Sequence, residues 1–262
     1  MSMVDDLVPL APVLGPSCMV VIPCYNEAAR LNPRQFYQFL DEGHPVHFLL
    51  VNDGSGDTTL QVLQEMQRHR PDRIFIMNNV RNMGKAESVR LGMLTAIELH
   101  NSAFTGFWDA DLATPLSSIP KLMEHLALDA ALQMVFGARV RLLGREIKRR
   151  AVRHYSGRVF ATVASLSLGI PIYDTQCGAK LFRISDDLAR VLKAPFLSRW
   201  IFDVEIIARF LALHREQSAY ARSAIYEMPL DRWEDVDGSK VSALDFARSF
   251  VDLIYIRHTY SR

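Results

Sequence analysis

The sequence has few cysteines, almost no net charge and no long apolar segment. Cys18, Cys24 and Cys177 show neither paired nor metal-ligand spacing, which favours a reducing compartment over a disulfide or zinc scaffold. A formal net charge of +1 gives the whole chain no electrostatic attraction to nucleic acid. The most apolar run, residues 159–173, is shorter than a bilayer span and is interrupted by glycine and proline. We therefore expect no transmembrane helix.

Two nucleotide-binding signatures are also missing. No G-x-G-x-x-G turn follows the first predicted strand, and no G-x-x-x-x-G-K-[ST] occurs, which argues against a dinucleotide fold and a P-loop NTPase. The start of the chain lacks a basic segment followed by an apolar one, so we expect no signal peptide. Residues 1–17, rich in proline, are expected to be a flexible leader. With 49% hydrophobic residues, residues 18–262 have enough apolar side chains for one domain.

Apolar runs alternate with helical periodicity through the first half of the chain, which predicts an α/β fold with a mainly parallel sheet flanked by helices. In such sheets ligands bind at the carboxyl ends of the strands. The predicted strands are 18–23, 47–52, 73–77, 106–108 and 134–137, and the predicted helices lie near 32–42, 60–66, 85–100 and 117–128.

Polar residues follow three of these strands. Asn26-Glu27, Asp53-Gly54-Ser55 and Asp109-Ala110-Asp111 each come just after a strand, so we expect them to meet at one edge of the sheet. The Asp-x-Asp pair offers hard carboxylate oxygens, which suit Mg²⁺ or Mn²⁺ carrying a substrate phosphate. Alone, the pair is a weak signal, because acidic residues also close strands as turn residues. The same alternative holds for Asp53 beside Gly54.

The ordered series of motifs is more specific than any one of them. Residues 20–27 (VVIPCYNE), 51–59 (VNDGSGDTT), 82–85 (NMGK) and 109–111 (DAD) resemble the inverting family-two glycosyltransferases with the GT-A fold. Residues 174–182 (DTQCGAKLF), 199–205 (RWIFDVE) and 237–240 (DGSK) resemble the polyprenyl-phosphate glycosyltransferases, above all the dolichyl-phosphate β-glucosyltransferases. Phe196 stands where polymerising relatives carry the Gln of Gln-x-x-Arg-Trp, which speaks against a processive synthase.

The resemblance implies an inverting, metal-dependent transfer of a hexose, with glucose the first choice, from a UDP-sugar to a polyprenyl phosphate. It implies Mg²⁺ or Mn²⁺ on Asp111 and a catalytic set of Asp111, Asp174, Arg139 and Arg232. A soluble hydroxyl acceptor (a glycan, metabolite or protein) and a nucleotide-sugar-binding module without turnover remain alternatives. The implied nucleotide-sugar-binding residues are Pro23, Tyr25, Asn26, Glu27, Asp53, Ser55, Gly84, Lys85, Asp109 and Ala110.

A phosphate acceptor needs positive charge more than a base, because the second pKa of a phosphate monoester is about 6. Residues 139–158 contain eight Lys or Arg side chains and one acidic residue, Glu146. As a helix they would carry a basic stripe opposite an apolar one, which favours a peripheral membrane-surface element on the cytoplasmic face. A solvated basic face over a core helix remains open, and nucleic acid is not expected. The stripes would be Arg145, Arg149 and Arg153 against Ile147, Ala151, Tyr155 and Val159, and the predicted acceptor-binding residues are Arg141, Arg145, Arg149, Arg153, Gln176 and Lys240.

Three further segments carry expectations. Asp203 and Glu205 do not share a helix face, and we expect Glu205 to be structural. Residues 242–258 have helical spacing and are expected to cover the core on the acceptor side, while residues 232–240 are a candidate lid. Cys177 is expected to be a packed side chain. The sequence does not indicate the oligomeric state.

Overall fold

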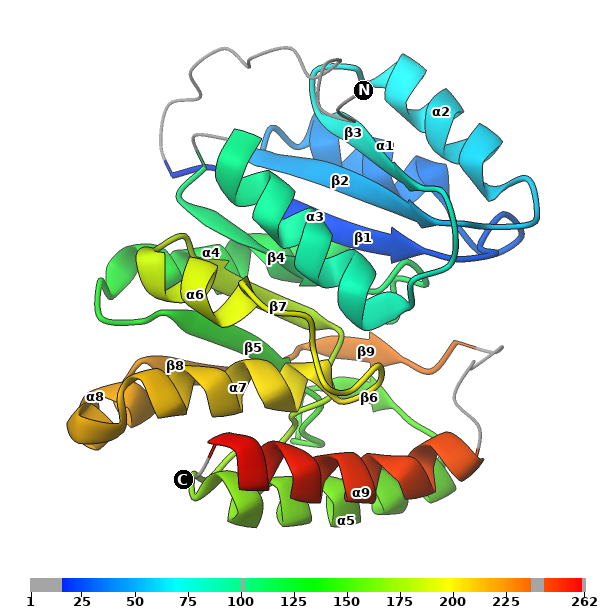
Figure 1. The fold of residues 1–262 in the computed structure, drawn as a ribbon. Helices are drawn as coiled ribbons and strands as arrows, with labels where there is room; N and C mark the ends of the chain where they lie inside the picture. Colours follow the sequence, from blue (N-terminus) through cyan, green and yellow to red (C-terminus); the bar gives the residue numbers. More distant parts are fainter. Residues whose placement is uncertain (1–15, 100–101, 237–242, 261–262) are drawn as a thin grey trace.

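The computed structural model describes residues 16–99, 102–236 and 243–260, and its centre is a seven-stranded sheet with helices on both faces (Figure 1). All strands predicted from apolar runs are present, with bounds that shift by a few residues. The strands of this sheet are β1 (Cys18–Cys24), β2 (Val46–Asp53), β3 (Ile74–Asn79), β4 (Phe104–Trp108), β5 (Met134–Ala138), β7 (Ala179–Arg183) and β8 (Ile225–Pro229).

The strand order is β3-β2-β1-β4-β7-β5-β8, and among the described strands of this sheet only β7 runs antiparallel to its neighbours. The predicted mainly parallel sheet is therefore confirmed. An antiparallel strand begins at the edge where its parallel neighbours end. Residues 174–178, which precede β7, consequently lie beside the carboxyl ends of β4 and β5, and the edge collects loops from both halves of the chain.

Helices cover both faces because side chains alternate between the faces along each strand. In β1, Val20 and Ile22 belong to the core under α1, α2 and α4, whereas Met19 and Val21 belong to the core under α3, α6 and α7. These cores anchor the strand ends that carry the polar loops. The helices are α1 (Pro33–Asp41), α2 (Thr59–His69), α3 (Lys85–Leu99), α4 (Ile119–Leu128), α6 (Asp186–Leu192), α7 (Phe202–Leu213) and α8 (Ser218–Ser223), with short 3₁₀ turns at Leu116–Ser118 and Arg215–Gln217.

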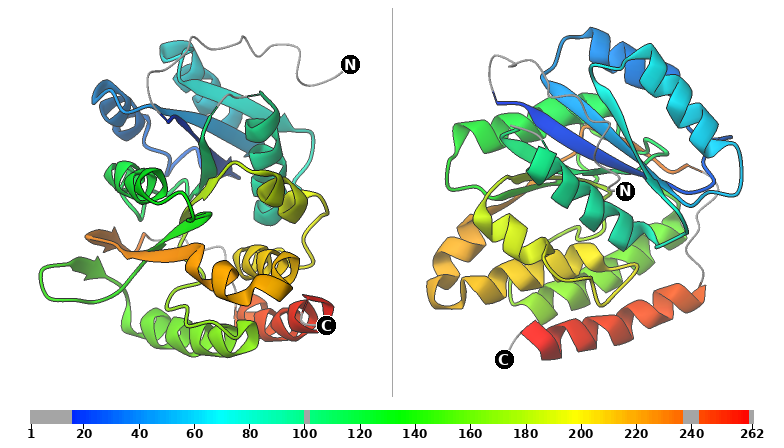
Figure 2. Two further views of the ribbon diagram at one scale, coloured as in Figure 1. Left: turned by 90° about the vertical axis from the view of Figure 1, so that its left-hand side faces the viewer. Right: turned by 45° about the horizontal axis from the view of Figure 1, so that its top comes forward.

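Two long helices, α5 (Ala151–Leu168) and α9 (Ala243–Tyr260), pack side by side beneath α7 (Figures 1 and 2). A third core joins them, in which Phe160 of α5 meets Val204 of α7 and Leu253 of α9. The predicted C-terminal helix is thus confirmed in its core-covering position. Within the described ranges, no helix has both the length and the apolar character needed to cross a bilayer.

The helix predicted across the basic segment is wrong in its first part. Residues 146–148 form a short strand, β6 (Glu146–Lys148), which pairs in parallel with β9 (Arg232–Glu234). Only Ile147 of β6 is buried, so the local pattern has the period of a strand, and its partner lies too far along the chain to be read from spacing. The helix begins at Ala151, and the basic stripe of Arg145, Arg149 and Arg153 does not form on one helix.

Parts of three predicted segments lie outside the described residues. These are most of the leader (residues 1–15), the end of the candidate lid (residues 237–240, with Lys240) and the start of the predicted C-terminal helix at Ser242. The described part of the lid segment, residues 232–236, includes β9.

Candidate active site

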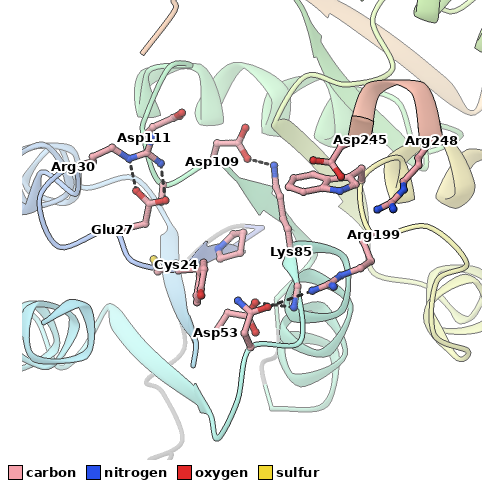
Figure 3. A pocket seen from close by; sticks show the side chains of 16 residues that line it. Cys24, Glu27, Arg30, Asp53, Lys85, Asp109, Asp111, Arg199, Asp245 and Arg248 are labelled. Carbon is pink, nitrogen blue, oxygen red and sulfur yellow. Dashed lines mark hydrogen bonds and ion pairs between the residues drawn. The ribbon is translucent and has the colours of Figure 1, made fainter. Parts of the chain in front are cut away.

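A cavity of about 710 Å³ opens at the carboxyl edge of β1, β2 and β4 (Figure 3). Its volume suits a small-molecule ligand. Asp111 lies on one side, Arg199 and Arg248 lie on the other, and Lys85 stands between them (Figure 3). The lining residues are Pro23, Cys24, Tyr25, Glu27, Arg30, Asp53, Asn82, Gly84, Lys85, Asp109, Ala110, Asp111, Arg199, Trp200, Asp245 and Arg248.

Asp109 is held from two directions at the end of β4. Its backbone N–H donates to the Gly178 carbonyl (3.0 Å), and its carboxylate accepts from the Lys85 ammonium at the start of α3. A Cβ on Gly178 would collide with the Asp109 carboxylate, so a side chain at this position would force that carboxylate or the loop to move. Burial alone would lower the pKa of Lys85, but the Asp109 carboxylate outweighs burial and raises that pKa. The Lys85 ammonium is therefore charged at neutral pH.

Asp111 is the carboxylate best prepared for a cation. Its Oδ1 accepts one hydrogen bond, from the Ala113 N–H (3.1 Å), and the next residue, Leu112, has a φ of +52°. Burial first, and then the neighbouring Asp109 carboxylate, raise the pKa of Asp111. A cation at this carboxylate would relieve both effects.

The donor set fits a metal that is shared with a substrate. Among the described residues, no cluster of three or more His, Cys, Asp and Glu side chains could enclose an ion. Mg²⁺ commonly binds through one or two carboxylates and completes its coordination with substrate phosphates and water. Asp111 beside the cavity matches that arrangement, with the remaining ligands left to a bound diphosphate.

Asp53 shapes the loop that begins α3. Its buried carboxylate accepts from the backbone N–H groups of Met83 and Gly84, each at 2.8 Å, and from the Asn79 amide at 3.2 Å. Gly84 has a φ of +91°, a conformation that favours glycine. The turn interpretation of Asp53 is therefore correct in geometry, although Asp53 also lines the cavity.

The loop after β1 is fixed by the loop after β2. Asn26, with a φ of +49°, donates its backbone N–H to Ser55 Oγ (3.1 Å) and accepts from the Gly56 N–H (2.9 Å). The Glu27 N–H donates to Thr59 Oγ1 (2.8 Å), and Arg30 forms a bidentate pair with the Glu27 carboxylate. These bonds leave Pro23, Tyr25 and Glu27 at the cavity wall.

A second ion pair lies further along the same edge. Arg139, just after β5, binds Asp174 bidentately (2.6 and 2.7 Å), and these side chains are only 11% and 8% exposed. Burial would raise the pKa of Asp174, but the Arg139 guanidinium outweighs it and holds that pKa well below its usual range. The Arg139 guanidinium also stacks on Trp233 at 5.2 Å. Neither Arg139 nor Asp174 lines the cavity described above.

Comparison with known proteins assigns the chain to a protein family. The sequence profile described as Glycosyl transferase family 2 matches residues 19–188, which hold β1 to β4, the Asp-x-Asp pair and β7. The chain belongs to glycosyl transferase family 2. It is a glycosyltransferase with the GT-A fold, as the motif series predicts.

Curated relatives of this family 2 glycosyltransferase are similar over most of their length. The dolichyl-phosphate beta-glucosyltransferase of Saccharomyces cerevisiae is 33% identical over 92% of this chain and 74% of its own. The Mus musculus enzyme of the same name is 29% identical over 92% of this chain and 75% of its own. Glucosyl-3-phosphoglycerate synthase of Mycobacterium tuberculosis, solved with Mn²⁺, UDP-glucose and phosphoglyceric acid, has a TM-score of 0.65 at 15% identity and covers 93% of this chain and 80% of its own. That likeness shows the fold.

The structure of this family 2 glycosyltransferase gathers most of the predicted donor residues around one cavity. All of them line it except Asn26 and Ser55, whose contacts with each other hold the loop after β1. Asp111 lines it too. The cavity also contains residues that the sequence interpretation did not assign to the site. Arg30, three residues from Glu27, could have been found as an ion-pair partner, but Asp245 and Arg248 come from α9, and no local signal links them to the strand ends.

The predicted acceptor residues are spread more widely. Arg145 forms an ion pair with Asp231, and Arg141 donates to the Arg149 carbonyl (2.5 Å). Arg232, predicted to be catalytic, lies in β9 within 3.6 Å of Glu146 and Glu234 and lines a depression of about 410 Å³ that shares Asp111 with the main cavity. Gln176 is partly exposed beside Asp174. The helix α5 includes Arg153, whose side chain is not among those described, and Lys240 lies outside the described residues.

The two remaining expectations are met by buried contacts. Glu205 is fully buried, accepts from the Leu197 N–H (2.8 Å) and pairs with Arg209, so its structural role is confirmed. Cys177 is a buried free thiol, and burial raises its pKa to about 11. A thiol with that pKa is a poor nucleophile at neutral pH.

Proposed function

We propose that this glycosyltransferase moves glucose from UDP-glucose to a polyprenyl phosphate of the dolichyl type, with Mg²⁺ or Mn²⁺ and with inversion at the anomeric carbon. The observation that carries the proposal is the cavity in which Asp111 faces the basic side chains Arg199 and Arg248. The names of the curated relatives supply the sugar and the acceptor class.

The cavity is arranged to hold a nucleotide diphosphate. A divalent ion held by Asp111 would act as a Lewis acid on the leaving diphosphate. Lys85, Arg199 and Arg248 supply positive charge around the same space, which favours the charge that develops as the diphosphate leaves. Asp109 is fixed by Lys85 and Gly178 at the cavity wall, and a carboxylate there is suited to accept a hydrogen bond from a ribose hydroxyl. Inversion follows if the acceptor oxygen attacks the face opposite the diphosphate.

Arg149 is the best candidate for binding the acceptor phosphate. Its guanidinium lies against Gly157 of α5, and no hydrogen bond or ion pair from the described part of the chain reaches it. Burial first, and then the charge of Arg139, lower the pKa of Arg149 to about 10. A phosphate monoester would neutralise this position, and being already ionised it would need orientation more than deprotonation.

A lipid acceptor also requires contact with a membrane, and α5 and α9 provide a face for it. Each helix packs one side into the third core and exposes apolar residues on another, and basic Arg141 and Arg150 are exposed just before α5. This surface replaces the predicted basic stripe and fits the surface of an anionic bilayer, proposed here to be the cytoplasmic leaflet. The exposed apolar residues are Tyr155, Val159, Val163 and Leu166 of α5 and Val251, Ile254 and Tyr255 of α9.

The experiment that tests the acceptor is a partition assay. Purified protein is incubated with UDP-[¹⁴C]glucose, Mg²⁺ or Mn²⁺ and a polyprenyl phosphate in detergent, and the products are extracted with organic solvent. We expect label in the organic phase, loss of that label with EDTA, and a β-glucosyl linkage by NMR. Label that enters only aqueous products would exclude the lipid acceptor and favour a soluble hydroxyl acceptor.

Membrane contact is tested separately by vesicle flotation. The wild-type protein should float with vesicles of phosphatidylcholine and phosphatidylserine, and the variant Val159→Ser/Leu166→Ser/Ile254→Ser should float several-fold less. The matched variant Val80→Ser/Leu128→Ser, which removes exposed apolar residues elsewhere on the molecule, should float like the wild type. Equal flotation of all three proteins would exclude the α5–α9 face.

A further inference from the structure

Lys180 is a lysine with no solvent-exposed surface, in the middle of the sheet. It lies in β7, opposite Phe107 of β4 on one side and Phe136 of β5 on the other. Its ammonium is 4.9 Å from the centre of the Phe136 ring and 6.0 Å from that of Phe107. A charge in such a place is costly unless it is hydrogen-bonded and paired.

One of the two polar partners of Lys180 belongs to residues 174–178, the loop that precedes β7 at the carboxyl edge of β4 and β5. Nζ donates to the Cys177 carbonyl (2.7 Å), three residues earlier in the chain, and lies 3.7 Å from the Asp203 carboxylate at the start of α7. The hydrogen bond joins the middle of the strand to the loop before it. Asp203 is itself buried, so the pair is shielded from solvent on both sides.

The loop from Asp174 to Gly178 connects the two halves of the site. Its first residue, Asp174, is bound by Arg139, and Glu227 accepts the Asp174 N–H (2.7 Å). The carbonyl of its last residue, Gly178, accepts a hydrogen bond from the Asp109 N–H. The Asp109 carboxylate occupies the space where a Cβ of Gly178 would lie. A shift of the Cys177 carbonyl would therefore move Asp109 relative to Asp174.

Stability alone does not account for a buried lysine here. Replacing a buried ion pair by neutral side chains of similar shape is often neutral or stabilising. We propose that Lys180 is a positioning residue, which holds the Cys177 carbonyl and thereby fixes the distance between Asp109 on the donor side and Asp174 on the acceptor side. The kinetic part of this inference rests on the proposed function.

The test removes both charges at once, so that neither is left unpaired. Lys180→Met/Asp203→Asn should melt within a few degrees of the wild type and bind UDP with a Kd within threefold of it. Its kcat for glucose transfer should fall at least tenfold while the KM for UDP-glucose changes less than threefold, because a displaced loop disturbs the reacting geometry more than binding. A crystal structure of this variant should show residues 174–178 and the Asp109 carboxylate displaced.

The matched control is Arg183→Met in the same strand. Arg183 also donates to backbone carbonyls, Leu132 O at 3.0 Å and Asp129 O at 3.1 Å, and stacks on Phe104 at 5.4 Å, but it is remote from the loop. The Arg183→Met variant should be less stable than the wild type and should keep the kcat of the folded enzyme. A double variant with wild-type kcat and loop position, or one that unfolds or melts lower than Arg183→Met, would overturn the inference. A wild-type enzyme that does not turn over UDP-glucose would refute the proposed function, and the loop position would still test Lys180.

Discussion

Two ion pairs at the same sheet edge differ in how far solvent reaches them. Lys85 and Asp109, on the side of β1 to β4, have side chains that are each 35% exposed, and both line the cavity. Arg139 and Asp174, beside β5 and β7, are 11% and 8% exposed and line none of it. The open pair can exchange partners with a ligand, whereas the closed pair keeps its own.

Under the proposed function, this difference divides the edge into an open side that would bind the donor and a closed side that would keep the backbone geometry fixed. Charges that remain accessible can respond to a diphosphate and its cation without first breaking a buried contact. Charges that are buried and doubly hydrogen-bonded are expensive to disturb, and they fix the backbone around them. Substitutions on the two sides should therefore fail differently: those on the open side lose activity, and those on the closed side lose stability first.

The largest effect should come from Asp111→Asn on the open side. The variant keeps an acceptor for the Ala113 N–H but loses the charge that would hold the metal. Glucose transfer should fall roughly 1,000-fold, because Lewis-acid stabilisation is worth several kcal/mol, while the melting temperature stays near that of the wild type. Steady-state kinetics at several Mg²⁺ and Mn²⁺ concentrations check this. Transfer that stays at the wild-type rate and remains sensitive to EDTA would place the metal elsewhere.

On the closed side, Asp174→Asn should mainly lower stability. Removing one partner leaves the Arg139 guanidinium buried without its counter-charge, which costs about 3–5 kcal/mol. Urea unfolding monitored by tryptophan fluorescence measures the change. A loss below about 1 kcal/mol would mean that the pair is effectively solvated and that the contrast between the two sides is absent.

The pair of Arg139 and Asp174 also predicts how the free energy of unfolding depends on pH in the acid range. Because Arg139 holds the folded pKa of Asp174 below its unfolded value, the stabilisation is complete above the unfolded pKa of about 3.9 and is lost as the pH falls below it. Between pH 5 and pH 3 the free energy of unfolding should fall more steeply for the wild type than for Asp174→Asn. Parallel slopes would contradict the assigned pKa direction.

Lys85→Met removes the open pair and should reverse the pattern. The loss of stability should stay below about 1 kcal/mol, because a pair that is one-third exposed contributes little. The specificity constant for UDP-glucose should fall about 10- to 100-fold, since the proposed donor site loses one of the positive charges that would stabilise the leaving diphosphate. Lys121→Met, which breaks the exposed pair with Asp231 away from the cavity, is the control and should leave the kinetics unchanged. Equal kinetic effects of both substitutions would contradict the role of Lys85.

The same contrast explains how much the sequence could predict. The open side is built from strand ends followed by polar residues, and parallel topology alone brings Asp53, Lys85 and Asp111 together, so their convergence could be predicted from order along the chain. The closed side depends on β7, which enters antiparallel between β4 and β5, and on the pairing of β6 with β9. Those contacts join residues distant in sequence, and no local periodicity encodes them.

The basic segment, residues 139–158, shows most clearly what local sequence patterns fail to predict. Its composition predicts a surface that meets phosphate or lipid, and Arg149 beside Gly157 is consistent with that chemistry. Its helical spacing was outweighed by the β6–β9 pairing, since Ile147 gains burial in a strand that it would not have on an exposed helix. No sequence pattern predicts that Arg248 lines the cavity, because the position of α9 depends on its packing against α5 and α7.

The smallest predicted effect on activity comes from adding a single methyl group at Gly178. This residue lies between the two sides, because it ends the loop before β7 and contacts Asp109. Gly178→Ala places a Cβ where the Asp109 carboxylate now lies, so that carboxylate must move away from Lys85 or the loop must shift. We expect kcat to fall about tenfold with little change in stability, since displaced catalytic geometry costs rate before it costs folding. Gly56→Ala, where a Cβ would meet no atom within 4 Å, controls for the substitution itself and should be silent. If Gly178→Ala is equally silent, the loop before β7 tolerates movement, and Asp109 does not need the backbone of Gly178 as its support.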